Sequence, residues 1–326
     1  MLVLDRALVE DLLDPGALVD AVAAAMADLS AGRASVPDRV GAFVPQRGVL
    51  GAMPGYVPSS GILMAKLVSL FPGNTALPTH QAVIAVFDPA TGRPDALLDG
   101  TAITALRTAA GSALSVRLLA RRDAHELAIL GTGVQARSHA AAVCRERPFR
   151  RVRVAGRTRE KTEALGRELA TTLGGIEVLA AGSWAEAMDG ADVVCATTHA
   201  DEPVVRREWL APGTHVTSVG YHPEGCEVDA ATVRDSLVCV ESRRTVLAPH
   251  PAGSNDLLQP IADGVITPEH VAVEIGELVA GTRPGRASAD QLTLYKSVGV
   301  AVQDAAAAAL VLAAARAAGL GREIEV

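Results

Sequence analysis

The sequence has no block of like charge and no basic stripe. Its 326 residues include 30 Lys and Arg against 37 Asp and Glu, for a formal net charge of −7, and the two signs are interspersed. Nucleic acids and anionic membranes both bind proteins through clustered Lys and Arg, so neither is an expected partner.

Cysteine is scarce and scattered. The four cysteines are Cys144, Cys195, Cys226 and Cys239, and no two of them form a CxxC pair. This spacing argues against a disulfide framework and against a zinc site, so no bound metal is expected. We interpret the thiols as small buried hydrophobic groups in a reducing compartment.

Long apolar runs are also missing. The longest runs from 305 to 315, between Asp304 and Arg316, and is shorter than the roughly 20 residues that a membrane-spanning helix needs. We expect a buried, Ala-rich helix there. The opening "MLVLDRALVEDLLDPGALVDAV" carries acids throughout and no basic-then-apolar signal pattern, so the expected location is the cytoplasm.

What is present indicates two domains, in keeping with the length. Helical spacing covers 15–31 and 99–120, with Asp99, Thr101 and Thr104 as candidate caps of the second helix. Between them, short apolar runs broken by Pro, Gly and Asn predict a sheet or a small barrel. The turn signal "DPATGRP" at 88–94 is expected to join two antiparallel strands.

From about residue 118 the pattern alternates between strand-like and helix-like runs. "LAILG", "RVRVAG", "DVVCATT" and "HVTSVG" are strand-like, and helix-like segments such as "RTREKTEALGRELATTLG" separate several of them. Such alternation predicts a parallel sheet with helical crossovers. The final segment, "QLTLYKSVGVAVQDAAAAALVLAAARAAG", is expected to be helical and to pack on the first domain.

A glycine-rich turn follows the first of these strands. "GTGVQA" places Gly131, Gly133 and Ala136 in a G-x-G-x-x-A pattern between a strand and a helix. The first glycine permits a tight turn, the second lets the backbone approach a pyrophosphate, and Ala136 allows close helix–strand packing. We therefore predict a Rossmann-type dinucleotide site, with the phosphates on N–H groups at the helix start.

The second strand ends in "AGRTREK" instead of the acid that binds a ribose 2′-hydroxyl in NAD enzymes. Arg157, Thr158, Arg159 and Lys161 suit a 2′-phosphate, so NADP is the preferred cofactor and NAD remains possible. The loops after later strands provide further candidate contacts, because such loops line the crevice of open α/β sheets. These candidates are Thr197, Thr198, His199, Val219 and Gly220.

Four segments together resemble the ornithine cyclodeaminase/mu-crystallin family over nearly the whole chain. They are "MAKLVSLFPGN…LPTHQAVIAVFDPATG", "DGTAITALRTAAGSA", "LGTGVQARSH" and "YKSVGVAVQDAAAA". The resemblance implies an α/β protein with a Rossmann domain over 118–292. It also implies a mixed α+β substrate-binding and dimerisation domain built from 1–117 and 293–326, and thus a homodimer.

The resemblance also implies roles for single residues. Arg39, Lys66 and Arg107 would grip the carboxylate of a small imine or amino-acid substrate and act as the catalytic set. Lys66 interrupts an apolar run, where a charge must reach solvent or meet an anion. The implied cofactor contacts are Thr79, His80, Arg107, Thr132, Val134, Gln135 and Ser297, in addition to the residues named above.

One departure separates this chain from true ornithine cyclodeaminases. Where they place an Asp for the side-chain amine of ornithine, "SVGYHPEG" has Tyr221, which is uncharged at neutral pH. We therefore expect reduction of an imine of an α-keto acid, or the reverse amino-acid oxidation. The proton donor would be Lys66, Tyr221 or His222. The alternatives are a cyclodeaminase-type lyase with bound NAD, a hydroxyproline dehydratase, and a non-catalytic protein that binds NADP or a small ligand.

Overall fold

The computed structural model describes residues 1–222, 224–249 and 252–325. The chain divides into two compact units, one of residues 1–107 and 299–326 and the other of residues 108–298. The boundaries expected from the sequence, 117/118 and 292/293, lie a short distance inside the second unit.

The first unit is built on a seven-stranded sheet with the order β15-β1-β6-β5-β4-β3-β2. Its strands are β1 (Leu2–Leu4), β2 (Val40–Val44), β3 (Gly48–Val57), β4 (Ile62–Leu70), β5 (His80–Phe87), β6 (Pro94–Asp99) and β15 (Arg322–Glu323). Only β1 and β6 pair in parallel; the other neighbours are antiparallel. Of the two predicted possibilities, the sheet is correct, and "DPATGRP" joins antiparallel β5 and β6 as expected.

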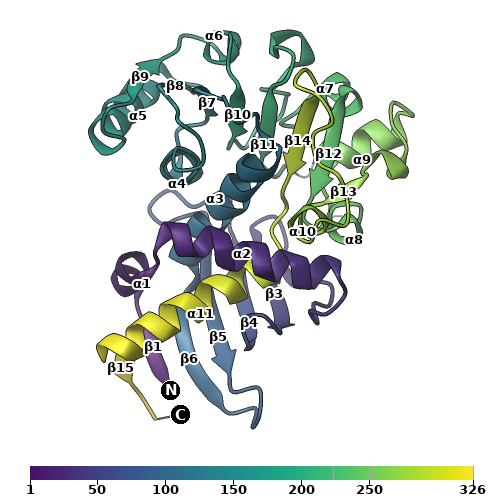
Figure 1. Cartoon of the computed structure of the whole chain (residues 1–326). Coiled ribbons are helices and arrows are strands. Elements are labelled where there is room, and N and C mark those ends of the chain that lie inside the picture. Colours follow the sequence, from purple (N-terminus) through teal and green to yellow (C-terminus); the bar gives the residue numbers. More distant parts are fainter. Residues whose placement is uncertain (223, 250–251, 326) are drawn as a thin grey trace. The chain divides into compact units, whose positions relative to one another are not determined.

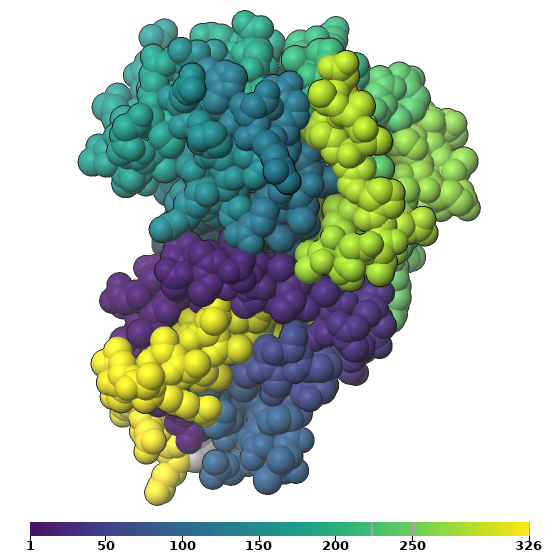
Figure 2. Space-filling view, viewed as in Figure 1, coloured from purple at the N-terminus to yellow at the C-terminus, as the bar shows by residue number. Residues whose placement is uncertain are grey.

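Within the described residues, three helices lie wholly in this unit: α1 (Arg6–Leu12), α2 (Pro15–Ser30) and α11 (Ala301–Ala318). Asp5 and Asp14 cap α1 and α2 by accepting backbone N–H groups. Helix α11 packs on α2 and on β3 and β4, and Figure 1 shows both helices crossing one face of the sheet. In Figure 2 the yellow C-terminal and purple N-terminal segments adjoin. The expected Ala-rich buried helix is therefore confirmed.

One described helix, α11, is long and apolar enough to cross a membrane by length and composition alone. Most of it, 61%, is buried within the protein. Its small Ala side chains allow close approach to α2 and to the sheet, as in a core helix.

The second unit contains an eight-stranded, wholly parallel sheet with the order β13-β12-β14-β11-β10-β7-β8-β9. Its strands are β7 (Glu126–Leu130), β8 (Arg151–Ala155), β9 (Glu177–Ala180), β10 (Val193–Ala196), β11 (His215–Ser218), β12 (Ser236–Val240), β13 (Val273–Glu274) and β14 (Leu292–Lys296). The order reverses between β7 and β10, as in Rossmann folds, so the predicted fold class is confirmed.

Strand β14 corrects the prediction for the end of the chain. "LTLYK" was expected to begin a helix, but it pairs in parallel with both β11 and β12 and is buried throughout. A strand that is buried on both faces has a nearly continuous apolar sequence. Sequence periodicity alone does not distinguish such a strand from a buried helix. Strand β14 also keeps residues 293–298 in the second unit.

The second unit's helices connect its strands. They are α4 (Val134–Val143), α5 (Arg159–Thr172), α6 (Trp184–Met188), α7 (Ala230–Asp235), α8 (Arg243–Val246), α9 (Asn255–Ala262) and α10 (Ile275–Val279), with single 3₁₀ turns at η1 (Arg207–Trp209) and η2 (Pro268–His270).

Helix α3 (Gly100–Leu119) is shared between the units, with the division after Arg107. Asp99 caps it through the N–H of Ala102, whereas the hydroxyls of Thr101 and Thr104 bond elsewhere, so only one of the three candidate caps is correct. The later half belongs to the second unit because Ser112 bonds Thr217 of β11.

Candidate active site

The first unit gathers the three predicted carboxylate-binding cations around the beginning of α11. Arg39 precedes β2, Lys66 lies in β4, and Arg107 lies in α3. Lys66 and Arg107 are only 1% and 5% exposed. Arg39 donates to the carbonyl of Gly299 at 2.7 Å. The expectation that these three residues converge is met within this unit.

Asp304, in the first turn of α11, joins two of the three cations. Its Oδ1 accepts from Lys66 Nζ at 2.9 Å and from Arg107 Nε at 3.2 Å, and its side chain is fully buried. Arg107 also donates to Gln303 Oε1 at 2.5 Å. Three cations with one carboxylate leave a formal surplus of positive charge, which suits a monoanionic ligand.

Two buried polar atoms of the cluster have no hydrogen-bond partner among the described residues: Asp304 Oδ2 and Gln303 Nε2. Buried polar atoms are rarely left unpaired, so such atoms point to a ligand or an ordered water at this place. Gly299, with φ +77°, supplies the space, because a Cβ there would lie 2.8 Å from Arg107 Nη2.

Burial has a chemical consequence for Lys66. Desolvation, the largest effect, lowers the pKa of Lys66 to about 8, assisted by Arg107 and Arg39 and opposed by Asp304. At neutral pH the ammonium group is therefore mostly protonated but holds its proton less tightly than an exposed lysine. This is suitable for a general acid.

The second unit has a cleft of about 680 Å³ at the end of β7 and β8. The predicted residues that line it are Gly131, Thr132, Gly133, Arg157, Thr158, Lys161, Thr197, Thr198 and His199. Gly131 adopts φ +119°, and a Cβ there would lie 2.7 Å from Thr197 Oγ1, so the turn requires glycine. A Cβ at Gly133 would meet no heavy atom within 4 Å, so the backbone there faces open space.

The beginning of α4 fits a phosphate. No side chain caps its N-terminus at Gly133, so its first N–H groups, including those of Val134 and Gln135, remain available. Ala136 is fully buried, as expected of a residue that packs the helix against the strand. These local features match the predicted pyrophosphate cradle.

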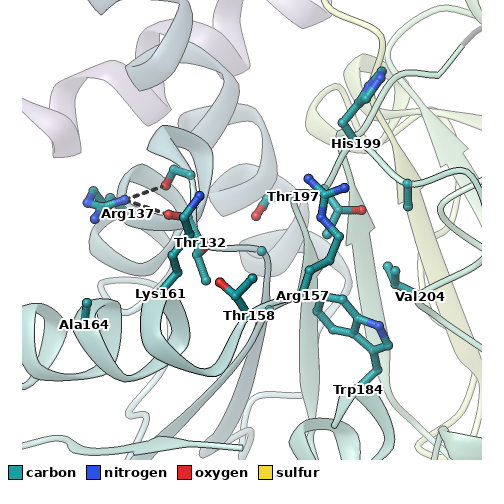
Figure 3. Close-up of a pocket in the computed structure, with 15 residues that line it drawn as sticks. Thr132, Arg137, Arg157, Thr158, Lys161, Ala164, Trp184, Thr197, His199 and Val204 are labelled. Atoms are coloured by element: carbon teal, nitrogen blue, oxygen red, sulfur yellow. Dashed lines mark hydrogen bonds between the residues drawn. The ribbon is translucent and has the colours of Figure 1, made fainter. Parts of the chain in front are cut away.

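Two cations at the other end of the cleft follow β8. Arg157 and Lys161 are exposed, and neither has an ion-pair or hydrogen-bond partner in the part of the chain that the structure describes. Figure 3 shows both side chains near Thr158, with Trp184 beside Arg157. The expectation for Arg159 was wrong: it pairs with Glu163 four residues along the same helix, at 2.7 Å, and is not among the residues that line the cleft.

Several predicted cofactor contacts are not among the described residues that line this cleft. Thr79 and His80 lie exposed at the beginning of β5, in the first unit. Ser297 donates to Glu241 Oε1 at 2.8 Å, and Val219 follows β11 without reaching the lining. Their roles, like a cofactor role for Arg107, stay predictions.

The structure also adds residues that the sequence analysis missed. Arg137 lines the cleft and donates to the carbonyls of Thr132 and Gly133 at 2.9 and 3.1 Å, as drawn in Figure 3. Asp304 was missed although a lone acid before an apolar helical run is a visible signal. Gly156 and Trp184 also line the cleft, and nothing in their local sequence indicated it.

The candidate proton donor His222 has both ring nitrogens occupied. Its Nδ1 accepts from the N–H groups of Glu224 and Gly225, and its Nε2 lies 2.8 Å from Asp201 Oδ1. This arrangement orders its own loop and leaves neither nitrogen available to a substrate. A donor role for Lys66 or Tyr221 stays a prediction.

Other features of the chain bear on metal chemistry and redox chemistry. No group of three or more His, Cys, Asp or Glu side chains with metal-binding geometry occurs among the described residues. All four cysteines are free; Cys195 and Cys239 are buried as expected, whereas Cys144 and Cys226 are only partly buried.

Comparisons with known proteins give one consistent result. The sequence model of the ornithine cyclodeaminase/mu-crystallin family matches residues 1–319. The mouse ketimine reductase mu-crystallin is 39% identical over 301 residues, 90% of each chain.

Two solved structures are similar over the whole chain. The Delta(1)-pyrroline-2-carboxylate reductase of Thermococcus litoralis, in complex with NADH and L-proline, has a TM-score of 0.95 and 38% identity, covering 99% of this chain and 100% of its own. An archaeal alanine dehydrogenase dimer with bound NAD has a TM-score of 0.93 and 29% identity, covering 100% and 99%. With the sequence motifs and both local sites in agreement, the chain belongs to the ornithine cyclodeaminase/mu-crystallin family.

Proposed function

We propose that the protein is a nicotinamide-dependent oxidoreductase that reduces an imine of an α-keto acid to an amino acid, or catalyses the reverse oxidation. The observation that carries the proposal is the cation cluster of the first unit: buried Lys66 and Arg107 share Asp304, and half-buried Arg39 bonds the Gly299 carbonyl. It provides a site for a small carboxylate and a proton donor in one place. The named activities of the similar proteins, ketimine and pyrroline-2-carboxylate reduction, support this substrate class.

Different residues of the chain would bind the substrate, protonate it and hold the cofactor. Two guanidinium groups can bind a carboxylate through paired hydrogen bonds and fix its orientation. Lys66, with its lowered pKa, can protonate the imine nitrogen, which makes the neighbouring carbon electron-poor. A bound nicotinamide supplies the hydride, and the glycine turn and the beginning of α4 hold its pyrophosphate.

The proposed cofactor is NADPH, with NADH as a weaker alternative. Arg157 and Lys161 are cations without partners in the described chain, and Thr158 adds a hydroxyl, which together suit a 2′-phosphate. The reductase and the alanine dehydrogenase compared above hold NADH and NAD, so the preference rests on these side chains alone.

The test is NADPH oxidation against a panel of cyclic ketimines, and of pyruvate and other keto acids with ammonia, with NADH assayed in parallel. We expect turnover with at least one carboxylate-bearing imine and faster turnover with NADPH. Tight NADPH binding without turnover on the whole panel would instead support a binding protein. Release of ammonia from ornithine without added cofactor would support a lyase, which Tyr221 disfavours because it offers no carboxylate to the side-chain amine.

We also propose a homodimer that pairs the uncovered face of the first unit's sheet. Val40, Ala52, Leu67 and Val83 are cross-strand neighbours in one row of β2 to β5. Val40, Leu67 and Val83 are 67%, 40% and 42% exposed, an apolar row on a sheet face that the helices leave open. A similar solved structure is described as a dimer.

Light scattering after size-exclusion chromatography tests this proposal. Leu67→Asp should convert the dimer to a monomer, because a charge would be buried at the interface. Leu179→Asp is the matched control, since Leu179 is 42% exposed on β9 of the second unit. A wild-type monomer, or a dimer that survives Leu67→Asp, would contradict the proposal.

A further inference from the structure

A buried carboxylate in the second unit joins two loops at the carboxyl edge of its sheet. Glu227, between β11 and α7, is 3% exposed. Its Oε1 accepts from the N–H of Thr198 at 2.5 Å and from the Thr198 hydroxyl at 2.7 Å. Its Oε2 accepts from Ser218 Oγ at 2.6 Å and from the N–H of Gly220 at 2.9 Å. Thr198 follows β10 and Gly220 follows β11, so one side chain fixes both strand ends.

The groups around the Glu227 carboxylate are themselves held by the ion pair of Lys296 and Asp256. Lys296 Nζ, fully buried, donates to Ser218 Oγ at 2.9 Å and to the Gly220 carbonyl at 2.7 Å, and lies 2.8 Å from Asp256 Oδ2. Asp256 Oδ1 accepts the N–H groups of Glu227 and Val228 at 2.7 and 2.8 Å. Every ammonium proton and both Glu227 oxygens have partners, and a fully satisfied buried network is rigid.

The two loops are also packed without free space. A Cβ at Gly220 would lie 2.4 Å from the Thr198 carbonyl and 2.7 Å from the carboxyl carbon of Glu227. A third link joins His199 Nδ1 to the Tyr221 carbonyl at 2.6 Å. Thr198 and His199 line the cleft, so their position is set by groups that do not themselves line it.

The strand order indicates which half of a dinucleotide these loops serve. The glycine turn follows β7 and the cations Arg157 and Lys161 follow β8, whereas β10 and β11 lie on the other side of β7. A dinucleotide that crosses the switch point of such a sheet has its adenosine half over β7 and β8 and its other half over β10 and β11.

We propose that Glu227 is a positioning residue for the nicotinamide half of the cofactor, acting through Thr198 and Gly220. The inference rests on the proposed function, because it assigns Glu227 to the same cofactor site. Glu227 bonds neither the glycine turn nor the residues after β8. Its loss should therefore impair hydride transfer while leaving recognition of the adenosine half unchanged.

The test is Glu227→Gln, in which an amide nitrogen replaces one oxygen and cannot accept from the donors that face it. We expect kcat/KM for imine reduction and the single-turnover rate with NADPH to fall by about 10- to 100-fold, since a displacement of roughly 1 Å can have that effect. The dissociation constant of 2′,5′-ADP, a probe of the adenosine half alone, should stay within about twofold of wild type because no contact to it is removed.

A matched control separates positioning from general stability. Asp192 accepts from the N–H groups of His125 and Glu126 at 2.8 and 3.0 Å and pairs with Arg121, at the amino edge of the same sheet. Asp192→Asn should lower the melting temperature but leave the single-turnover rate unchanged. Ser218→Ala keeps Glu227 and both loop N–H groups, so it should lower the single-turnover rate by less than Glu227→Gln does. It replaces Glu227→Gln as the test variant if Glu227→Gln does not fold.

Two results would overturn the inference. The first is a single-turnover rate in Glu227→Gln and Ser218→Ala that is as high as the rate in Asp192→Asn. The second is an equal weakening of 2′,5′-ADP binding and NADPH binding in Glu227→Gln. If the wild-type protein reduces no imine of the panel, the proposed function is refuted, and so is the positioning role of Glu227 that rests on it. Wild-type turnover with unaffected loop variants refutes the role of Glu227 alone.

Discussion

The two units bind anions, on our proposal, by opposite means. In the first unit Lys66 and Arg107 are buried and share Asp304, so their positions are fixed before any ligand arrives. In the second unit Arg157 and Lys161 are exposed, and neither has a partner in the described chain.

The difference follows from what each site must do. Buried charges keep their geometry and have shifted pKa values, as Lys66 has, because water does not screen them. Exposed charges attract a phosphate but move freely and are screened by salt, with a Debye length of about 8 Å at physiological ionic strength. The first arrangement suits chemistry and the second suits selection among cofactors.

The strongest test of this comparison is Lys66→Met. Losing the proton donor and one carboxylate contact should lower kcat/KM for imine reduction by about 10²- to 10⁴-fold, the range for general acids. NADPH binding, measured by fluorescence titration, should be nearly unchanged because the cofactor cleft is untouched.

Arg316→Met is the control for Lys66→Met. Arg316 also belongs to the first unit and pairs with Asp95 at 2.6 Å, but its side chain is 54% exposed. Exposed ion pairs contribute about 0–1 kcal/mol, so activity should be normal. Wild-type rates in Lys66→Met would remove Lys66 from the mechanism.

The pH dependence of kcat/KM should reflect the titration of the buried Lys66 amine. With a pKa of about 8 in the free protein, Lys66 loses its proton above that pH, and kcat/KM should fall about tenfold per pH unit. A bound carboxylate favours the ammonium form, so the fall in kcat should begin at higher pH. Lys66→Arg keeps a charge that does not titrate there, and its remaining activity should show no bend near pH 8.

The pH dependence of stability has the opposite sign to that of activity: the free energy of unfolding rises with pH where the activity falls. The folded pKa of Lys66 lies below the 10.5 of an unperturbed lysine, so the unfolded chain binds more protons between about pH 8 and 10.5. The contribution of Lys66 to the free energy of unfolding therefore rises across that window. Denaturant titrations of wild type and Lys66→Met at pH 7.5 and 10 would measure it as a difference.

Sequence patterns predicted the local features and failed on the non-local ones. Gly131, Gly133 and the strand before them were correctly predicted as a strand-to-helix turn, because such a turn is contiguous in the chain. Asp304 was missed because its partners Lys66 and Arg107 are 238 and 197 residues away in sequence. Strand β14 was taken for helix because only its neighbours β11 and β12 distinguish a doubly buried strand.

On the cofactor side, the sharpest substitution is Gly133→Ala. Gly133 has φ −88°, which alanine adopts readily, and the added methyl meets no atom of the protein within 4 Å. The melting temperature should therefore stay the same or rise slightly. NADPH binding should weaken by about 10-fold or more, because the methyl group occupies the space where the backbone approaches the pyrophosphate.

Gly131→Ala provides the contrast. Its φ of +119° and the 2.7 Å approach to Thr197 Oγ1 predict loss of stability together with loss of binding. Two glycines in one turn would thus separate a requirement of the fold from a requirement of the ligand. Undiminished NADPH binding in Gly133→Ala would place the pyrophosphate elsewhere.

The smallest expected effect concerns the choice between NADPH and NADH. Arg157→Ala should lower the NADPH-to-NADH ratio of kcat/KM by about tenfold, equivalent to about 1.4 kcal/mol, mainly by weakening NADPH. Because an exposed cation acts through a screened attraction, the wild-type preference should also shrink as salt is raised. Arg159→Ala is the matched control, since Arg159 is two residues away, exposed, and paired with Glu163 outside the cleft lining. An unchanged ratio in Arg157→Ala, or an equal change in Arg159→Ala, would mean that the cations after β8 do not recognise the 2′-phosphate. The second unit would then have no anion site that selects between cofactors.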